Sequence, residues 1–83
     1  MTIYYHPKFK RMYRKLDHEL QKLAEEREKL FRADPFDSRL DTHKLHGRLK
    51  KFWSFEVNRK NHIMFEFDGP DVIFLKIGDH ADY

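Results

Sequence analysis

Residues 52–77 read FWSFEVNRKNHIMFEFDGPDVIFLKI, and this stretch decides the fold. Three runs within it, at 52–58, 62–67 and 72–77, alternate side chains with the period of two that is typical of β-strands. Turn-forming residues separate the runs, NRKN at 58–61 and DGPD at 68–71. The pattern therefore predicts an antiparallel meander of three strands.

Alternation also gives each predicted strand two faces. In the first run it assigns Trp53, Phe55 and Val57 to the core. In the third run it forms one face from Ile73, Leu75 and Ile77, with Phe74 and Lys76 on the other. Helices can cover only one side of such a sheet, so the opposite face is expected to stay open. We expect it to carry the polar side chains Ser54, Glu56, Asn58, His62, Glu66 and Lys76.

Upstream of the meander, apolar residues recur at helical spacing through residues 8–32. A single helix over this stretch would be about 37 Å long at 1.5 Å per residue, which is too long for so small a domain. Asp17 is a good N-cap, so we expect a short helix to about Leu16 and a longer one over 18–32. Residues 2–6 predict a first strand, and Pro7 suits the first turn of a helix.

These elements predict an α+β fold for a single domain over residues 1–83. It consists of an N-terminal strand, two helices packed on one face of an antiparallel sheet, and the C-terminal three-strand meander. The chain lacks cysteine, which excludes disulfides and cysteine-based zinc sites. No apolar run approaches the ~18–20 residues of a membrane span, and residues 1–7 lack the apolar stretch of a signal peptide. We therefore expect a soluble, cytoplasmic protein that does not engage a membrane.

Charge is distributed in blocks along the chain. Residues 42–60 hold six bases against the single acid Glu56, whereas residues 17–41 hold eight acids against five bases. A basic block favours a surface that attracts a polyanion, although ordinary solvated charge would give the same counts. For a nucleic-acid partner, the expected contacts are Lys44, His46, Arg48, Lys50, Lys51, Arg59 and Lys60.

Four of the six histidines, His43, His46, His62 and His80, lie in the second half of the chain. Metal-free RNA cleavage needs a base for the 2′-hydroxyl proton, an acid for the departing 5′-oxygen, and stabilisation of the negative charge that builds up. Histidine suits both proton roles because it titrates near neutral pH. His43 and His46 could share a metal within a helix, but Gly47 and the basic surroundings argue against this. We expect neither a metal nor another cofactor.

Three motifs resemble the RelE/ParE superfamily of toxins. Residues 43–57, HKLHGRLKKFWSFEV, are similar to that family's K-L-x-G-x-L-x-G-x-W-S-x-x-V core. Residues 61–67, NHIMFEF, resemble its Y-R-I-I-F-E-F strand, and residues 77–83, IGDHADY, resemble its closing I-G-x-H-D-x-Y. The resemblance implies a RelE-like fold and the toxin of a type II toxin–antitoxin system. Such a toxin forms a hetero-oligomer with its cognate antitoxin and often cleaves mRNA, commonly on the ribosome.

The site pattern is closest to the YoeB and YafQ branches, and the resemblance implies a role for four residues. His80 matches the near-terminal histidine that acts as acid or base, and Tyr83 falls near the terminal aromatic that helps to seat the RNA. His43 sits where these branches have a glutamate or histidine acting as base. His62 occupies the column of an arginine that stabilises the phosphate.

Two departures from the family pattern leave alternatives open. A histidine at 62 is cationic only when protonated, so charge stabilisation can pass to Arg48, Arg59 or Lys60. Ser54 and Glu56 stand where RelE has catalytic lysines. The alternatives are a ParE-like inhibitor of DNA gyrase, which would not need His80 beside a terminal tyrosine, and a catalytically degenerate module that only binds an antitoxin.

Overall fold

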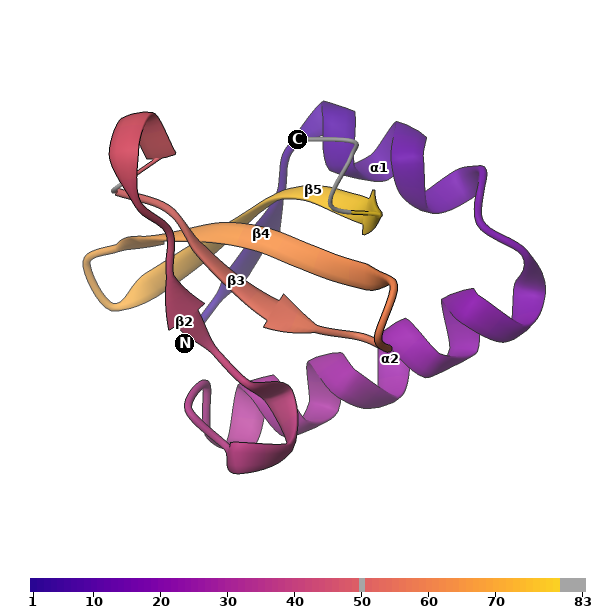
Figure 1. The fold of residues 1–83 in the computed structure, drawn as a ribbon, viewed down its shortest axis with the longest axis horizontal. Coiled ribbons are helices and arrows are strands. Elements are labelled where there is room, and N and C mark those ends of the chain that lie inside the picture. The colour runs from indigo at the N-terminus through magenta and orange to yellow at the C-terminus, as the bar shows by residue number, and fades with distance from the viewer. Residues whose placement is uncertain (50, 80–83) are drawn as a thin grey trace.

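A computed structural model describes residues 1–49 and 51–79 of the chain (Figure 1). Strand β1 (Ile3–Tyr5) leads into helices α1 (Pro7–Arg14) and α2 (His18–Ala33). Two 3₁₀ turns (Ser38–Leu40 and Gly47–Leu49) flank the short strand β2 (His43–Lys44). The chain then forms β3 (Trp53–Glu56), β4 (Asn61–Asp68) and β5 (Asp71–Asp79). No helix among the described residues has the length and apolar character needed to cross a membrane.

The five strands form one sheet in the order β1-β5-β4-β3-β2. The predicted meander is confirmed, because β3, β4 and β5 pair antiparallel in sequence order. Strand β1 pairs with β5 in parallel, and β2, which the sequence pattern did not predict, pairs antiparallel with β3. The α+β class is confirmed, with a sheet that is mixed rather than wholly antiparallel.

The two helices meet at the predicted corner. The carboxylate of Asp17 accepts a hydrogen bond of 2.8 Å from the backbone N–H of Leu20 and so caps α2. Pro7 occupies the first turn of α1, where its missing N–H costs no hydrogen bond. The side chain of Gln21 donates to the backbone carbonyl of Tyr13 at 2.9 Å and ties the helices together.

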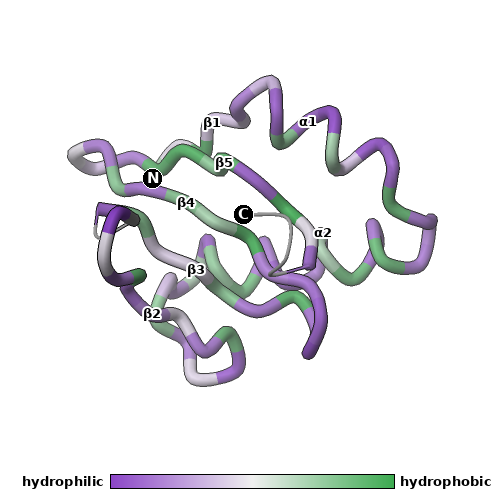
Figure 2. The backbone as a smooth tube through the Cα atoms, turned by 45° about the horizontal axis from the view of Figure 1, so that its top comes forward, coloured by the Kyte–Doolittle hydropathy of each residue, from purple (hydrophilic) through white to green (hydrophobic). Residues whose placement is uncertain are grey.

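The core lies between the helices and one face of the sheet. Polar and apolar residues alternate along both helices in Figure 2, as expected for helices that bury one side. Phe31 of α2 packs its ring against Phe55, Phe65 and Phe74, with centroid separations of 4.8, 4.9 and 5.4 Å. All four side chains are fully buried. Phe55 and Val57 belong to this core as predicted, and Trp53 packs against its margin.

Strand β5 contains a β-bulge. Phe65 pairs with Phe74 and the preceding residue Met64 pairs with Lys76, so Leu75 is an extra residue on β5. An extra residue resets the alternation of faces beyond it.

The bulge overturns one prediction about β5. Val72 and Phe74 point into the core before the bulge, and Ile77 does so after it. The prediction that Ile73, Leu75 and Ile77 share one face, with Phe74 and Lys76 on the other, is therefore wrong. Simple alternation assumes an unbroken strand, whereas the bulge puts Phe74 in the core and Lys76 on the opposite face.

Candidate functional site

The sheet face turned away from the helices, called here the outer face, carries the candidate site. Paired residues on neighbouring strands point to the same side of a sheet. The register forms one cross-strand row from His43, Ser54, Met64 and Lys76. A second row, two residues further along β3, consists of Glu56, His62 and Gly78. The outer face thus brings His43 and His62 onto one surface.

His43 is exposed, and its position determines which ring nitrogen can act as a base. Its Nδ1 lies 2.8 Å from the backbone carbonyl oxygen of Asp41. A carbonyl oxygen can only accept a hydrogen bond, so Nδ1 carries the proton and donates it. In the neutral ring this leaves the lone pair on Nε2, which can remove a proton from a substrate.

The carbonyl that orients His43 belongs to a residue with an unusual backbone conformation. Asp41 has φ 48° and ψ 44°, the left-handed region, and is the one non-glycine residue with positive φ within the described part of the chain. Aspartate tolerates this region better than most residues. Such backbone conformations are often found where a neighbouring group must be held in place. Sequence reasoning missed Asp41, because nothing in the residue pattern marks its conformation.

Ser54 and His62 were predicted to be exposed on the outer face, but both are buried. Ser54 is fully buried, and His62 retains 8% exposure. Ser54 is buried because of its place in the first row, where its short side chain lies between the larger His43 and Met64 on the neighbouring strands. Met64 is also buried and was not singled out from the sequence.

Asn58 was predicted to lie on the outer face, but its side chain is used in a turn instead. Its side-chain oxygen accepts hydrogen bonds from the backbone N–H groups of Lys60 (3.0 Å) and Asn61 (2.8 Å) and from the Asn61 amide (3.1 Å). These bonds hold the predicted turn between β3 and β4. The side-chain oxygen of Asn58 is therefore used within the turn.

The basic residues predicted to bind RNA form two groups rather than one. Lys44, His46, Arg48 and Lys51 are exposed on β2 and the segment that leads into β3. Arg59 and Lys60 are exposed in the turn beyond the other end of β3, a strand that is itself roughly 13 Å long at 3.3 Å per residue. The outer face lies between the two groups. Three further predicted site residues, Lys50, His80 and Tyr83, lie outside the described residues.

Lys76 extends the first row toward α1. Burial lowers the pKa of its ammonium below the ordinary value, and the positive charge of Lys8 at the start of α1 lowers it further. Lys8 was missed from the sequence because only the packing of α1 beside β5 brings it near the outer face. Two neighbouring cations favour an anion at this end of the row.

We expect the substitution Lys8→Met to raise the pKa of Lys76 toward its ordinary value. Removing the like charge leaves only the burial effect, so the return should be partial. An NMR titration of the Lys76 side chain measures it. The matched change Lys10→Met, on the same helix, should leave the Lys76 titration in place. An unaltered Lys76 pKa in Lys8→Met would show that the two ammonium groups do not interact.

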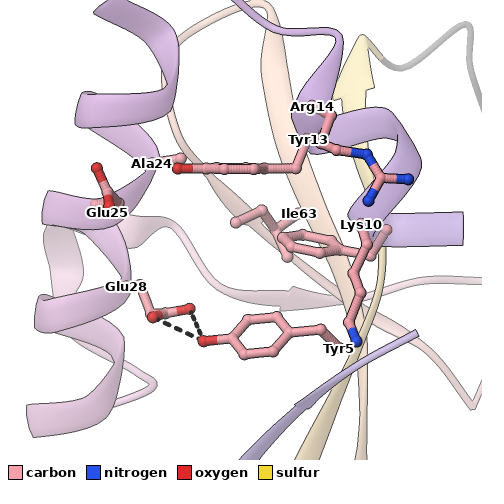
Figure 3. Close-up of a pocket in the computed structure, with 9 residues that line it drawn as sticks. Tyr5, Lys10, Tyr13, Arg14, Ala24, Glu25, Glu28 and Ile63 are labelled. Atoms are coloured by element: carbon pink, nitrogen blue, oxygen red, sulfur yellow. Dashed lines mark hydrogen bonds between the residues drawn. The ribbon is translucent and has the colours of Figure 1, made fainter. Parts of the chain in front are cut away.

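A separate pocket of about 370 Å³ lies between the helices (Figure 3). Lys10 and Arg14 of α1 face Glu25 and Glu28 of α2 across it. The Tyr5 hydroxyl donates to the Glu28 carboxylate at 2.7 and 2.9 Å, and burial together with this carboxylate raises the pKa of Tyr5. The pocket is on the helix side of the sheet and contains neither His43 nor His62.

The described residues contain no group of three or more histidine, cysteine, aspartate or glutamate side chains that could hold a metal ion.

No protein-family model and no curated protein sequence matches the chain. Solved structures do match it. The YoeB/ParE toxin from Agrobacterium tumefaciens superposes with a TM-score of 0.82, at 13% identity over 96% of this chain and 99% of that one. The chain has the RelE-like toxin fold. The YoeB–YefM complex from Staphylococcus aureus gives 0.79 at 15% identity, over 96% and 97% of the two chains.

YafQ from E. coli shares the RelE-like fold with a TM-score of 0.72, at 17% identity over 96% of this chain and 93% of that one. The fold implied by the motifs in residues 43–83 is therefore confirmed. Because β1 and β5 pair in the structure, residues well outside those motifs contribute to the RelE-like sheet.

Proposed function

We propose that this chain is the toxin of a type II toxin–antitoxin system and an endoribonuclease that cleaves mRNA. The observation that carries the proposal is the orientation of His43 on the outer face of a RelE-like sheet. Its Nδ1–H is bound to the Asp41 carbonyl, so its Nε2 is available as a base. His62 and Lys76 on the same face can offer positive charge to a phosphate.

In the proposed reaction, His43 Nε2 removes the proton from a ribose 2′-hydroxyl. The oxygen attacks the adjacent phosphorus while the bond to the 5′-oxygen breaks, and His80 gives that oxygen a proton. The products are a 2′,3′-cyclic phosphate and a 5′-hydroxyl. Protonated His62 and the flanking cations stabilise the negative charge of the transition state, and Tyr83 seats the RNA. The reaction needs no metal and no cofactor.

The two basic groups support a path for the substrate. A single strand of RNA that crosses the outer face would meet His46, Arg48 and Lys51 beyond one end of β3 and Arg59 and Lys60 beyond the other, with Lys44 at the β2 edge. Lys50 is a further proposed RNA contact. Phosphate contacts of this kind supply affinity that is independent of sequence.

The proposed partners are a cognate antitoxin, which would form a hetero-oligomer with the chain, and mRNA on the ribosome in the cytoplasm. The S. aureus YoeB structure named above is a complex with YefM, and it has the same fold. That likeness is the reason for proposing a protein antitoxin here.

Induced expression without an antitoxin tests the proposal. We expect growth arrest, new mRNA 5′ ends within translated codons, and relief of both by His80→Ala. Assays of the purified protein on mRNA with and without ribosomes then decide whether cleavage depends on translation. Intact mRNA together with blocked gyrase supercoiling would favour the gyrase alternative. Intact mRNA with normal growth would favour the module that only binds an antitoxin.

A further inference from the structure

An exposed aromatic cluster lies on the helix side of the sheet, at its β2 edge. Phe36 is 56% exposed and Phe67 is 39% exposed, and their rings stack with centroids 6.1 Å apart. The Trp53 ring meets both edge-on, at 5.6 and 5.5 Å. We call these three residues the aromatic platform. Large apolar side chains that gather on a surface often mark a binding site.

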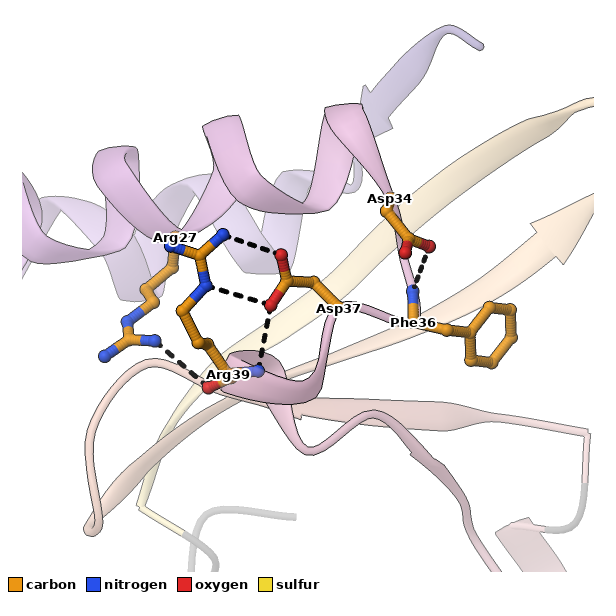
Figure 4. A network of polar contacts seen from close by, with 5 residues as sticks. All are labelled: Arg27, Asp34, Phe36, Asp37 and Arg39. Atoms are coloured by element: carbon orange, nitrogen blue, oxygen red, sulfur yellow. Dashed lines mark hydrogen bonds and ion pairs between the residues drawn. The ribbon is translucent and has the colours of Figure 1, made fainter.

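The loop before β2 holds Phe36 in place. Its backbone N–H donates to the Asp34 carboxylate at 2.9 Å, and the Thr42 hydroxyl donates to the carbonyl of Pro35. Figure 4 shows the Phe36 ring directed away from the ion pair of Asp37 and Arg39 on the same loop. The loop backbone that carries the exposed ring is therefore held in place, which lowers the entropy cost of binding a ligand.

Strand β2 connects the platform to the candidate site. Lys44 pairs with Trp53, so its side chain is on the side of the platform. His43 is the preceding residue and points to the outer face, because successive side chains of a strand alternate. Strand β2 is the last strand of the sheet, so a flexible chain can pass around its edge from His43 to the platform.

The charges near the platform favour a polyanion. Lys44 is exposed beside Trp53, and Arg48 and Lys51 are exposed on the segment that follows. Of the nearby acids, Asp37 is paired with Arg39 at 2.8 Å, and this guanidinium lowers its pKa to about 2. The Asp34 carboxylate is bound to the Phe36 N–H. Asp68 follows Phe67 and pairs with Asp71, which puts it on the opposite side of the strand.

We propose that the aromatic platform stacks a base of single-stranded RNA that flanks the cleaved nucleotide, with the strand bending around the edge of β2. This inference rests on the proposed ribonuclease function and adds a second RNA subsite to it. Aromatic rings beside cations are the combination that proteins use to bind single strands without sequence preference. Lys44 pairs with a phosphate between the platform and His43.

Trp53 is the only tryptophan of the chain, so its fluorescence reports directly on the platform. The probe is a short 2′-O-methyl oligoadenylate, which lacks the attacking hydroxyl and stays intact. We expect it to quench Trp53, whereas an abasic strand of equal length binds through its phosphates with little quenching. Phe36→Ala should weaken binding of the oligoadenylate about tenfold, the size expected for one stacked base, and Phe36→Tyr should restore it.

Tyr4→Ala is the matched control. Tyr4 is an aromatic of similar exposure, 53%, on β1 at the opposite edge of the sheet. It should bind the oligoadenylate like the unmodified chain. Thermal melts of the Phe36 and Tyr4 variants check that each is folded. Phe67→Tyr is a variant at a second residue of the platform, and it retains an aromatic ring.

The outcomes separate the subsite from the ribonuclease function. If the unmodified chain and Phe36→Ala bind and cleave RNA equally well, the platform is not an RNA subsite and the ribonuclease proposal stands. If no variant binds or cleaves RNA, the ribonuclease proposal itself fails, and the subsite with it. A dimer that sedimentation detects and Phe36→Ala abolishes, with RNA binding unchanged, would assign the platform to a second copy of the chain.

Discussion

Phe31→Ala is expected to cost about 3–5 kcal/mol of unfolding free energy, the range measured for buried aromatic residues changed to alanine. The Phe31 ring is fully buried and contacts rings from β3, β4 and β5. Its loss leaves a cavity where α2 packs against all three meander strands. Domains of this size are stable by only about 5–15 kcal/mol, so much of the protein should be unfolded at moderate urea concentrations. Urea titration followed by far-ultraviolet circular dichroism measures the loss.

Phe36→Ala deletes the same atoms at a surface position and is the matched control. Because Phe36 is more than half exposed, its truncation should change the unfolding free energy by only about 1 kcal/mol or less. Equal losses in the two variants would mean that the cluster around Phe31 is not the main source of stability.

His43→Ala is expected to lower the rate of RNA cleavage by about 10²–10⁴-fold, the range attributed to a general base. The side chain is exposed, so the fold should be preserved. The measurement is single-turnover cleavage of a defined RNA by the purified protein. A rate constant that falls while RNA affinity stays constant would identify a proton-transfer role, since a residue that only binds RNA would alter the affinity instead.

His18→Ala is the control for a general histidine effect. His18 is exposed at the start of α2, on the helix side of the sheet, and should leave cleavage unchanged. Cleavage by His43→Ala at the unmodified rate would exclude His43 as the base. His62 and Glu56 would then be the candidates for that role.

The parts of the fold that could be predicted from sequence are those whose pattern repeats over several residues. The meander has many alternating positions, and the corner at Asp17 follows from the length limit on a single helix together with a capping residue. Strand β2 has two residues, both polar and exposed, so no period could reveal it. The parallel pairing of β1 with β5 joins Ile3 to Val72 and depends on the whole intervening chain.

The candidate site, like the fold, was predicted only in part. Alternation placed His62 on the outer face correctly, because β3 and β4 pair without a bulge from Trp53 to Glu56. It could not find the hydrogen bond between His43 and Asp41, which depends on a left-handed backbone conformation. The burial of Ser54 was also missed, since it depends on the size of its neighbours on the two adjacent strands.

The bulge at Leu75 also affects how this chain is compared with related sequences. Leu75 is one residue more than a regular ladder needs, and without it Phe74 and Lys76 would be adjacent opposite Phe65 and Met64. A homologue with a straight fifth strand would therefore align only with a single-residue gap inside that strand. Gaps are normally placed in loops, so an ungapped alignment would be one residue out of register on one side of Leu75. It would then match core positions of one protein to outer-face positions of the other.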